Sequence, residues 1–261
     1  MGKISFSIYI NLILIFFYSQ FIFSQNEFHY EWYVNGDLRE GKLLYDINNH
    51  NAIYVDLIST EKNVKKRSNE GLNLAPGESA TIIEAYISWD DRLFFKKDNK
   101  IKFTTDLLKK RFFVDDATLQ LQWKLKEDTK EINGYHCKKA TVNLRGRDWE
   151  VWYTPDIPMY YGPWKFYGLP GLIVAAYESS GKFWFQLTKM TTNSDMIFPE
   201  IISKDFKYVS LKEYDLLEEE IHSGRAFYDI GVIENKDYKR NGIELIYEWE
   251  NIDLNYNNYE K

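Results

Sequence analysis

Cysteine and histidine are scarce in this sequence of 261 residues, and their scarcity excludes several kinds of site. The single cysteine, Cys137, allows no intramolecular disulfide, so buried side chains must stabilise the fold. On a strand His136 and Cys137 point to opposite faces, so they cannot form a thiol–imidazole pair, and we interpret Cys137 as a buried thiol. The four histidines have no metal-ligand spacing such as H-x-x-x-H, and we therefore predict neither a metal site nor a cofactor.

The common sequence motifs of catalysis are also absent. There is no G-x-S-x-G elbow, no phosphate-binding loop and no G-x-G-x-x-G turn. The adjacent acids Asp90–Asp91 and Asp115–Asp116 are typical of solvated turns and strand ends. A carboxylate pair that cleaves glycosides comes from separate elements, however, so a hydrolase that draws on the 39 acidic residues stays open as an alternative.

Positive charge is in deficit, because the formal net charge is −6. A nucleic-acid partner requires a basic footprint, so we predict none, and the same deficit disfavours a surface that binds anionic lipid head groups. The one basic cluster, at Lys62–Arg67, is interpreted as a solvated loop. Nothing in the sequence indicates an oligomeric state.

Long apolar runs are confined to the N-terminal 25 residues. Lys3 precedes two apolar runs that lie between Ile8 and Phe23, a pattern typical of a secretory signal peptide. We therefore predict a signal peptide over residues 1–25 and a single domain over residues 26–261, exported to the periplasm or associated with the outer membrane. An uncleaved anchor over Ile4–Phe23, which is long enough to span a bilayer, is the alternative.

Aromatic residues and alternating patterns are abundant. With 8 Trp, 20 Tyr and 17 Phe, the chain can bury a substantial core or line a cavity. The alternation of apolar and polar residues predicts strands, and Asn35–Gly36 and Asn133–Gly134 predict tight hairpin turns. Strands are predicted over residues 28–34, 43–47, 53–57, 81–89, 92–97, 100–105, 111–114, 119–125, 135–144, 148–154, 172–177, 182–190 and 244–251.

One helix is predicted after Ser210, which can cap it together with Glu213, and Gly224 can end it. Hairpin connections imply antiparallel pairing, and a long flat sheet would leave an apolar face exposed. We therefore expect a mainly β fold: one large curved antiparallel sheet, half-open and barrel-like, with few helices packed on its concave side.

The segment Gly162–Ile173 interleaves glycine, proline and large apolar residues with one lysine, which is typical of a buried and sharply bent backbone. Its spacing predicts a single helical turn over Trp164–Tyr167 and a type II turn with positive φ at Gly171. We expect the segment to pack against the sheet as a plug that closes one end of it. The alternative is that it shapes the mouth of an apolar pocket. The residues expected to face the sheet are Trp164, Phe166 and Leu169.

Two cations lie in or near this segment. Lys165 is interpreted as a surface lysine whose stem covers apolar neighbours. For Arg147, beside Trp149, a cation–π contact and anion binding are alternatives, but a structural ion pair with an acid is favoured. The motif and candidate pocket comprise Arg147, Trp149, Trp152, Gly162, Pro163, Trp164, Lys165, Phe166, Gly168, Leu169, Pro170 and Gly171.

Residues Gly168–Ile173 spell GLPGLI, and the chain resembles the GLPGLI family of secreted Bacteroidota proteins, which have no established activity. The stretches Ile132–Ala140, Gly146–Trp149 and Gly162–Phe166 also fit that family's pattern. The resemblance implies a location in the cell envelope and a mostly β fold. More loosely, the pattern is similar to half-open β-barrels of the LolA/LolB lipoprotein-carrier type, which hold acyl chains in an aromatic cleft, and this is an analogy of fold only.

The aromatic content and the lack of catalytic motifs favour a non-enzymatic binding protein of the cell envelope. Its partner would be an apolar ligand, a lipid or a segment of another envelope protein. One alternative is a hydrolase that acts on an envelope polymer through unrecognised carboxylates. Another is an integral outer-membrane β-barrel, which the polar strand face of Gln120, Gln122 and Lys124 disfavours.

Overall fold

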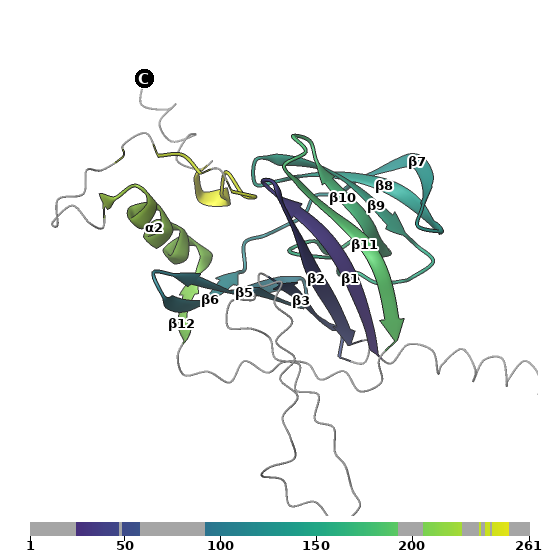
Figure 1. Cartoon of the computed structure of the whole chain (residues 1–261), viewed down its shortest axis with the longest axis horizontal. Helices are drawn as coiled ribbons and strands as arrows, with labels where there is room; N and C mark the ends of the chain where they lie inside the picture. The colour runs from purple at the N-terminus through teal and green to yellow at the C-terminus, as the bar shows by residue number, and fades with distance from the viewer. Residues whose placement is uncertain are drawn as a thin grey trace, which may run out of the picture.

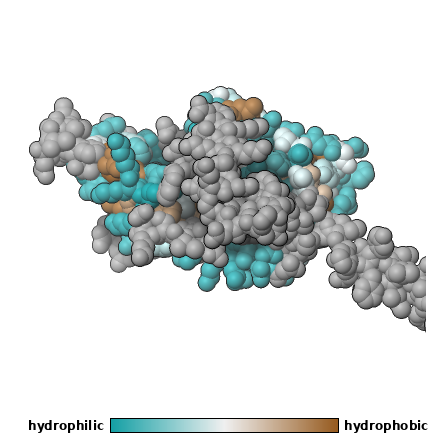
Figure 2. All heavy atoms as spheres, turned by 60° about the horizontal axis from the view of Figure 1, so that its bottom comes forward, coloured by the Kyte–Doolittle hydropathy of each residue, from teal (hydrophilic) through white to brown (hydrophobic). Residues whose placement is uncertain are grey.

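The structure is a computed structural model, and it describes residues 25–46, 49–57, 92–192, 206–225, 235, 238–240 and 242–250. Apart from Gln25, the predicted signal peptide lies outside the described residues, as do the basic cluster Lys62–Arg67 and the strand predicted over 81–89. In the described part of the chain, no helix is both long and apolar enough to cross a membrane. On the face shown in Figure 2, hydrophilic residues make up most of the described surface, with small hydrophobic patches among them.

One twelve-stranded sheet dominates the fold (Figure 1). The chain builds a first meander from β1 to β6 and a second from β7 to β11, and β11 joins the second meander to the first by pairing with β1. The strands are β1 (Gln25–Val34), β2 (Asp37–Asp46), β3 (Asn51–Leu57), β4 (Arg92–Lys97), β5 (Lys100–Leu107), β6 (Lys110–Asp116), β7 (Lys124–Ile132), β8 (Tyr135–Leu144), β9 (Arg147–Thr154), β10 (Leu172–Glu178), β11 (Phe183–Thr192) and β12 (Phe206–Ser210).

The sheet is open, because β12 and β7 are its two ends in the described part of the chain. The prediction of a large, half-open, mainly β fold is therefore confirmed. The sheet is mixed rather than purely antiparallel, since β12 pairs with β6 in parallel. The alternative of an integral outer-membrane barrel, which requires a closed sheet, is wrong. The end strand β7 exposes nearly all of its mostly charged side chains, and charges protect a sheet end from pairing with other chains.

The predicted hairpin turns are confirmed. Asn35 and Gly36 connect β1 to β2 with φ of 48° and 109°, and Asn133 and Gly134 connect β7 to β8 with φ of 52° and 80°. Two consecutive positive φ angles characterise the turn whose twist matches that of the flanking strands, and asparagine and glycine tolerate them best.

One face of the sheet carries most of the buried core, and we call it the core-bearing face. Trp32 of β1 stacks on Phe185 of β11, with ring centroids 5.3 Å apart and planes 2° from parallel. Phe185 also lies 6.0 Å from the ring of Trp149 on β9, so a continuous aromatic layer spans the second meander. The side chains of these strands that point away from this core form the other side of the sheet, which we call the outer face.

Helix α2 (Leu211–His222) packs on the core-bearing face beside β5 and β6. Ser210 and Glu213 form the predicted capping box, and Gly224 follows the helix with φ of 82°. The ring of Tyr214 lies 5.5 Å from that of Phe112 on β6. A cap of this kind contributes about 1 kcal/mol to helix stability, and the buried tyrosine fixes the helix to the sheet.

One predicted strand is formed only at its end, and another is not formed. Residues 119–123 alternate between more buried and exposed side chains as predicted, but the strand begins only at Lys124. Trp123 uses its indole N–H to donate to the carbonyl oxygen of Tyr167 (2.8 Å), so this stretch packs on the plug. Residues 244–247 are irregular and 248–250 form a helical turn, where a late strand was predicted.

The plug connects β9 to β10, and it buries Trp164, Phe166 and Leu169 as predicted. Its backbone forms a reverse turn, in which the N–H of Phe166 donates to the carbonyl of Pro163 (3.0 Å). The predicted helical turn over Trp164–Tyr167 is wrong, because Trp164 has a φ of 48°, outside the right-handed helical range.

Gly171 is required for a different reason from the one predicted. Its φ is not positive, so the expected type II turn geometry is wrong. A Cβ atom at this position would instead lie 2.1 Å from the carbonyl oxygen of Thr154, which is backbone and cannot rotate away. The close approach of the plug to the end of β9 therefore depends on the absent side chain. Gly168, by contrast, has a positive φ, at 90°.

Lys96 of β4 fastens the plug to the first meander. Its side chain is 2% exposed, and its ammonium group donates to the carbonyl oxygens of Gly162 and Phe166. No salt bridge to Lys96 is formed within the described residues. Burial without a carboxylate lowers the pKa of Lys96 well below its ordinary value.

We predict that Gly171→Ala destabilises the protein by about 3 kcal/mol, because the new methyl group overlaps backbone atoms of Thr154. Gly242→Ala, where a Cβ atom would meet nothing closer than 3.9 Å, should change stability by less than about 0.5 kcal/mol. Urea unfolding of both variants measures the difference. Equal stability of the two variants would show that the plug relaxes without cost.

We also predict that the contribution of Lys96 to the free energy of unfolding increases with pH. Its folded pKa lies below the unfolded value near 10.5, so the unfolded chain binds the extra proton in the window between them. The difference in stability between the wild type and Lys96→Met should therefore grow as pH rises toward 10.5. Urea unfolding at several pH values tests this prediction. A difference in stability between the wild type and Lys96→Met that falls as pH rises would contradict it.

Candidate functional site

A buried cluster of ionised side chains lies directly beneath the plug. Lys165 is only 1% exposed, and its ammonium nitrogen lies 2.8 Å from Oδ2 of Asp116 and 2.7 Å from Oε2 of Glu244. The prediction of a surface lysine is wrong, because acids from β6 and from residues 242–250 compensate the charge inside the protein. The same ammonium lies 4.5 Å from the ring centre of Phe103.

Arg145 completes this cluster. Its guanidinium binds both carboxylate oxygens of Asp116, at 2.8 and 2.6 Å, and also contacts Glu244 and Glu248. Burial works against ionisation of Asp116, but the charge of Lys165 and the hydrogen bond from Arg145 outweigh it and lower the pKa of Asp116. Two cations and three acids are therefore held together, and the cluster joins β6, the β8–β9 turn, the plug and residues 242–250.

Arg147 ties residues 242–250 to the sheet at a second point. Its guanidinium donates to the carbonyl oxygen of Gly242, at 2.6 and 3.0 Å, and lies 3.3 Å from Oε1 of Glu178. This is the structural ion pair favoured by the sequence. The cation–π partner is Phe183, with 4.6 Å between the guanidinium carbon and the ring centre, rather than Trp149.

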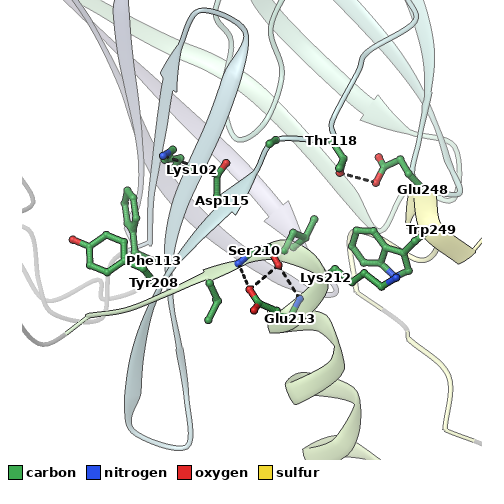
Figure 3. Close-up of a pocket in the computed structure, with 13 residues that line it drawn as sticks. Lys102, Phe113, Asp115, Thr118, Tyr208, Ser210, Lys212, Glu213, Glu248 and Trp249 are labelled. Carbon is green, nitrogen blue, oxygen red and sulfur yellow. Dashed lines mark hydrogen bonds and ion pairs between the residues drawn. The ribbon is translucent and has the colours of Figure 1, made fainter.

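Residues 248 and 249, held by this cluster, form one wall of a surface groove of about 770 Å³ (Figure 3). The other walls are β6 with the residues that follow it, β12, and the first turn of α2. Parallel pairing of β12 with β6 carries the chain directly into the helix, which places the helix start over the groove. The groove is lined by Lys102, Phe113, Asp115, Ala117, Thr118, Tyr208, Val209, Ser210, Leu211, Lys212, Glu213, Glu248 and Trp249.

Aromatic rings lie at both ends of the groove. Phe113 of β6 and Tyr208 of β12 are edge-to-face with ring centres 5.2 Å apart, and Tyr208 is 63% exposed. Trp249 lies on the opposite side of the groove, where it stacks on Tyr247 at 4.8 Å (Figure 3). An exposed aromatic ring held by a second ring is a rigid contact surface for a ligand.

The polar side chains of the groove are mostly held in place by their own contacts. Glu213 accepts hydrogen bonds from the backbone and side chain of Ser210, which lower its pKa. Glu248 pairs with Arg145 and accepts from Thr118 at 3.2 Å. Oδ2 of Asp115 lies 3.2 Å from the ammonium of Lys102, while Oδ1 is shielded and has no hydrogen-bond partner in the described part of the chain. The groove thus offers acceptors fixed around apolar walls.

Most of the residues predicted from the sequence pack in the core instead of lining this groove. Trp149, Trp164 and Phe166 are buried against one another, with ring centres 5.1–6.0 Å apart. Gly162, Pro163, Leu169 and Gly171 are buried, Gly168 and Pro170 are exposed, and Trp152 is buried beneath the ammonium of Lys130 at 4.1 Å. The role of these twelve residues in binding stays a prediction.

The sequence did not single out the three aromatic residues of the groove, Phe113, Tyr208 and Trp249. Phe113 fell in the strand predicted over 111–114 and Trp249 in the one predicted over 244–251, and β12 was not predicted. Its only sequence signal is the apolar–polar alternation just before the capping residue Ser210.

Reactive groups are few in the described part of the chain. Cys137 is buried, and burial raises the pKa of its thiol to about 11, so it is not a thiolate at neutral pH. Within the described residues, no group of three or more histidine, cysteine and acidic side chains is arranged to hold a metal ion.

The family model described as "N-glycanase peptide, N-terminal domain" matches residues 51–209, which is more than half of the chain. The chain belongs to this family. Among solved structures, it is similar to PNGF-II in a P21 crystal form, with a TM-score of 0.51 and 15% identity, over 74% of this chain and 33% of that one. The C2 form of PNGF-II gives 0.48 and 16%, over 74% and 32%.

The chain thus spans about a third of the length of PNGF-II, and the likeness concerns the fold. An uncharacterised conserved protein from Thermus thermophilus is also similar, with a TM-score of 0.39 and 8% identity, over 77% of this chain and 98% of that one. No curated protein matches the chain. The matched family is not the GLPGLI family, so that resemblance stays a prediction.

We predict that Asp116→Asn destabilises the protein by about 3 kcal/mol, because it leaves the buried cations Arg145 and Lys165 undercompensated. The adjacent Asp115→Asn removes an exposed ion pair with Lys102, so its cost should stay below about 1 kcal/mol. Chemical unfolding of the two variants under the same conditions gives the comparison. Equal costs would show that the cluster adds no more stability than a surface pair.

Proposed function

We propose that this chain is a non-catalytic binding domain that takes a glycan-bearing peptide in the groove between β6, β12, α2 and residues 248–249. The observation that carries the proposal is the combination of exposed Tyr208, backed by Phe113, with Trp249 across the groove. The apolar face of a sugar ring packs on such rings, and its hydroxyl groups donate to fixed acceptors. Membership of an N-glycanase N-terminal family supports a glycan over the apolar ligand, lipid or protein segment expected from the sequence.

The pKa shifts of the acidic side chains in and near the groove favour binding over hydrolysis. Cleavage of a glycoside needs one carboxyl group with a raised pKa, and the pKa of Glu213 in the groove is lowered. Burial raises the pKa of Asp215 to about 6 and also raises the pKa of Glu218, but neither residue lines the groove. Both oxygens of Asp215 accept from Arg240 at 2.9 Å, so the carboxyl group is held by the protein itself.

Export is part of the proposal. It is supported by Lys3 and the apolar runs before residue 25, which are typical of a signal peptide. The GLPGLI pattern of the plug supports a place in the cell envelope, either in the periplasm or at the outer membrane.

We predict that Tyr208→Ala and Trp249→Ala each weaken binding of an N-glycosylated peptide by about tenfold, because each removes one aromatic wall of the groove. Tyr160→Ala is the matched control: Tyr160 is 61% exposed, close to the 63% of Tyr208, but lies outside the groove. Titration calorimetry with the glycopeptide and with the same peptide lacking its glycan measures the effect.

Equal affinity for the two peptides, or equal loss in the Tyr160 and Tyr208 variants, would refute the proposed function. Mass spectrometry of the purified protein is the second test. A lipid that co-purifies with the wild type and is lost in the Tyr208 variant would assign the groove to an apolar ligand instead.

A further inference from the structure

A row of aromatic side chains crosses the outer face of the sheet, far in sequence from the groove residues. Trp184 of β11 is paired with Tyr33 of β1 on one side and with Tyr177 of β10 on the other. The neighbours Phe183 and Phe185 are buried in the core, so Trp184 points to the outer face. Pairing of Tyr33 with Leu38 extends the row to β2. We call Leu38, Tyr33, Trp184 and Tyr177 the outer aromatic row.

The outer aromatic row is accessible and ordered by its own contacts. Leu38 is 56% exposed, and the three aromatic residues are each partly exposed. The rings of Tyr33 and Trp184 are 6° from parallel, with centres 5.8 Å apart. The exposed parts of these rings do not pack in the core. A run of such rings across adjacent strands forms an apolar strip that a ligand can contact.

A polar hollow of about 410 Å³ continues the row beyond Tyr177. Its lining includes Glu150, the cross-strand partner of Tyr177, and the hydroxyl and amide side chains of Thr141, Ser179 and Asn143. Hydrogen-bond donors and acceptors at the end of an aromatic strip match a ligand that has both apolar faces and hydroxyl groups.

Charge narrows the class of ligand. The hollow contains the acids Asp148 and Glu150 and one lysine, Lys124, and the whole chain carries −6. Lys139 lies 2.7 Å from Glu150 and is already paired with it. The ammonium of Lys130 lies 5.6 Å from the ring centre of Tyr177, so the acids at this end of the row are balanced by lysines, and the row presents no uncompensated charge to an ionic ligand. A neutral chain of sugar rings satisfies both the strip and the hollow.

We propose that the outer aromatic row and the adjoining hollow form a second binding site, for a neutral oligosaccharide. The site goes beyond the proposed function, because it uses β1, β10 and β11, none of which lines the groove at β12. Sugar rings pack along Tyr33, Trp184 and Tyr177, and hydroxyl groups reach Glu150 and Thr141 at the end of the row.

Substitution of Trp184 by phenylalanine and by leucine tests the site. Phenylalanine keeps an aromatic ring, whereas leucine keeps apolar volume without one, so the pair separates stacking from packing. With free N-acetylchitotetraose as the probe, Trp184→Leu should bind about tenfold more weakly than Trp184→Phe. Urea unfolding confirms that both variants are folded.

The second site would be overturned if the affinities of Trp184→Leu and Trp184→Phe for the tetrasaccharide lay within about twofold of each other. Tyr160→Ala, which changes an exposed aromatic residue outside both sites, should leave binding of the free tetrasaccharide unchanged, and an equal loss in this variant would overturn the second site. The groove is judged separately, by its preference for the glycosylated peptide, so either site can fail while the other stands.

Discussion

The buried cluster of Asp116, Arg145, Lys165 and Glu244 is the interaction on which the rest of the structure depends. It joins the last residues of β6, the β8–β9 turn, the plug and residues 242–250 at one point. Buried charges cost several kcal/mol each unless all are paired, so the four parts are stable only together. Replacement by apolar residues could give equal stability in principle, but it would not fix the same geometry, because ion pairs demand specific distances.

The groove follows from that cluster. Both carboxylate oxygens of Glu248 accept hydrogen bonds from Arg145, at 3.0 and 3.2 Å, and these contacts set the position of Trp249 beside the start of α2. The opposite wall is fixed independently, by the parallel pairing of β12 with β6 and by the capping box at Ser210. A wall held by ion pairs and a wall held by backbone hydrogen bonds thus face each other across the groove. The outer aromatic row depends on neither wall, because the register of the paired strands places its rings.

Local patterns in the sequence predicted the parts of the fold that local physics decides. Asn–Gly pairs indicated the hairpins, alternation indicated most strands, and Ser210 with Glu213 indicated the helix start. Two predictions that depended on distant partners were wrong: Lys165 is buried because Asp116 and Glu244 compensate its charge, and Gly171 is required by the backbone of Thr154. The groove was missed for the same reason, because Phe113, Tyr208 and Trp249 come from three separate stretches that only the tertiary structure brings together.

The ion cluster also has a consequence for the order of folding. Arg145 and Glu244 are 99 residues apart, so the acid is synthesised long after the arginine that it pairs with. Contacts between such distant residues form late, because a long loop must close first. Until residues 242–250 dock, Arg145 and Lys165 share only Asp116, and Trp249 has no place beside the helix. A nascent chain would therefore lack one wall of the groove until residues 242–250 have docked.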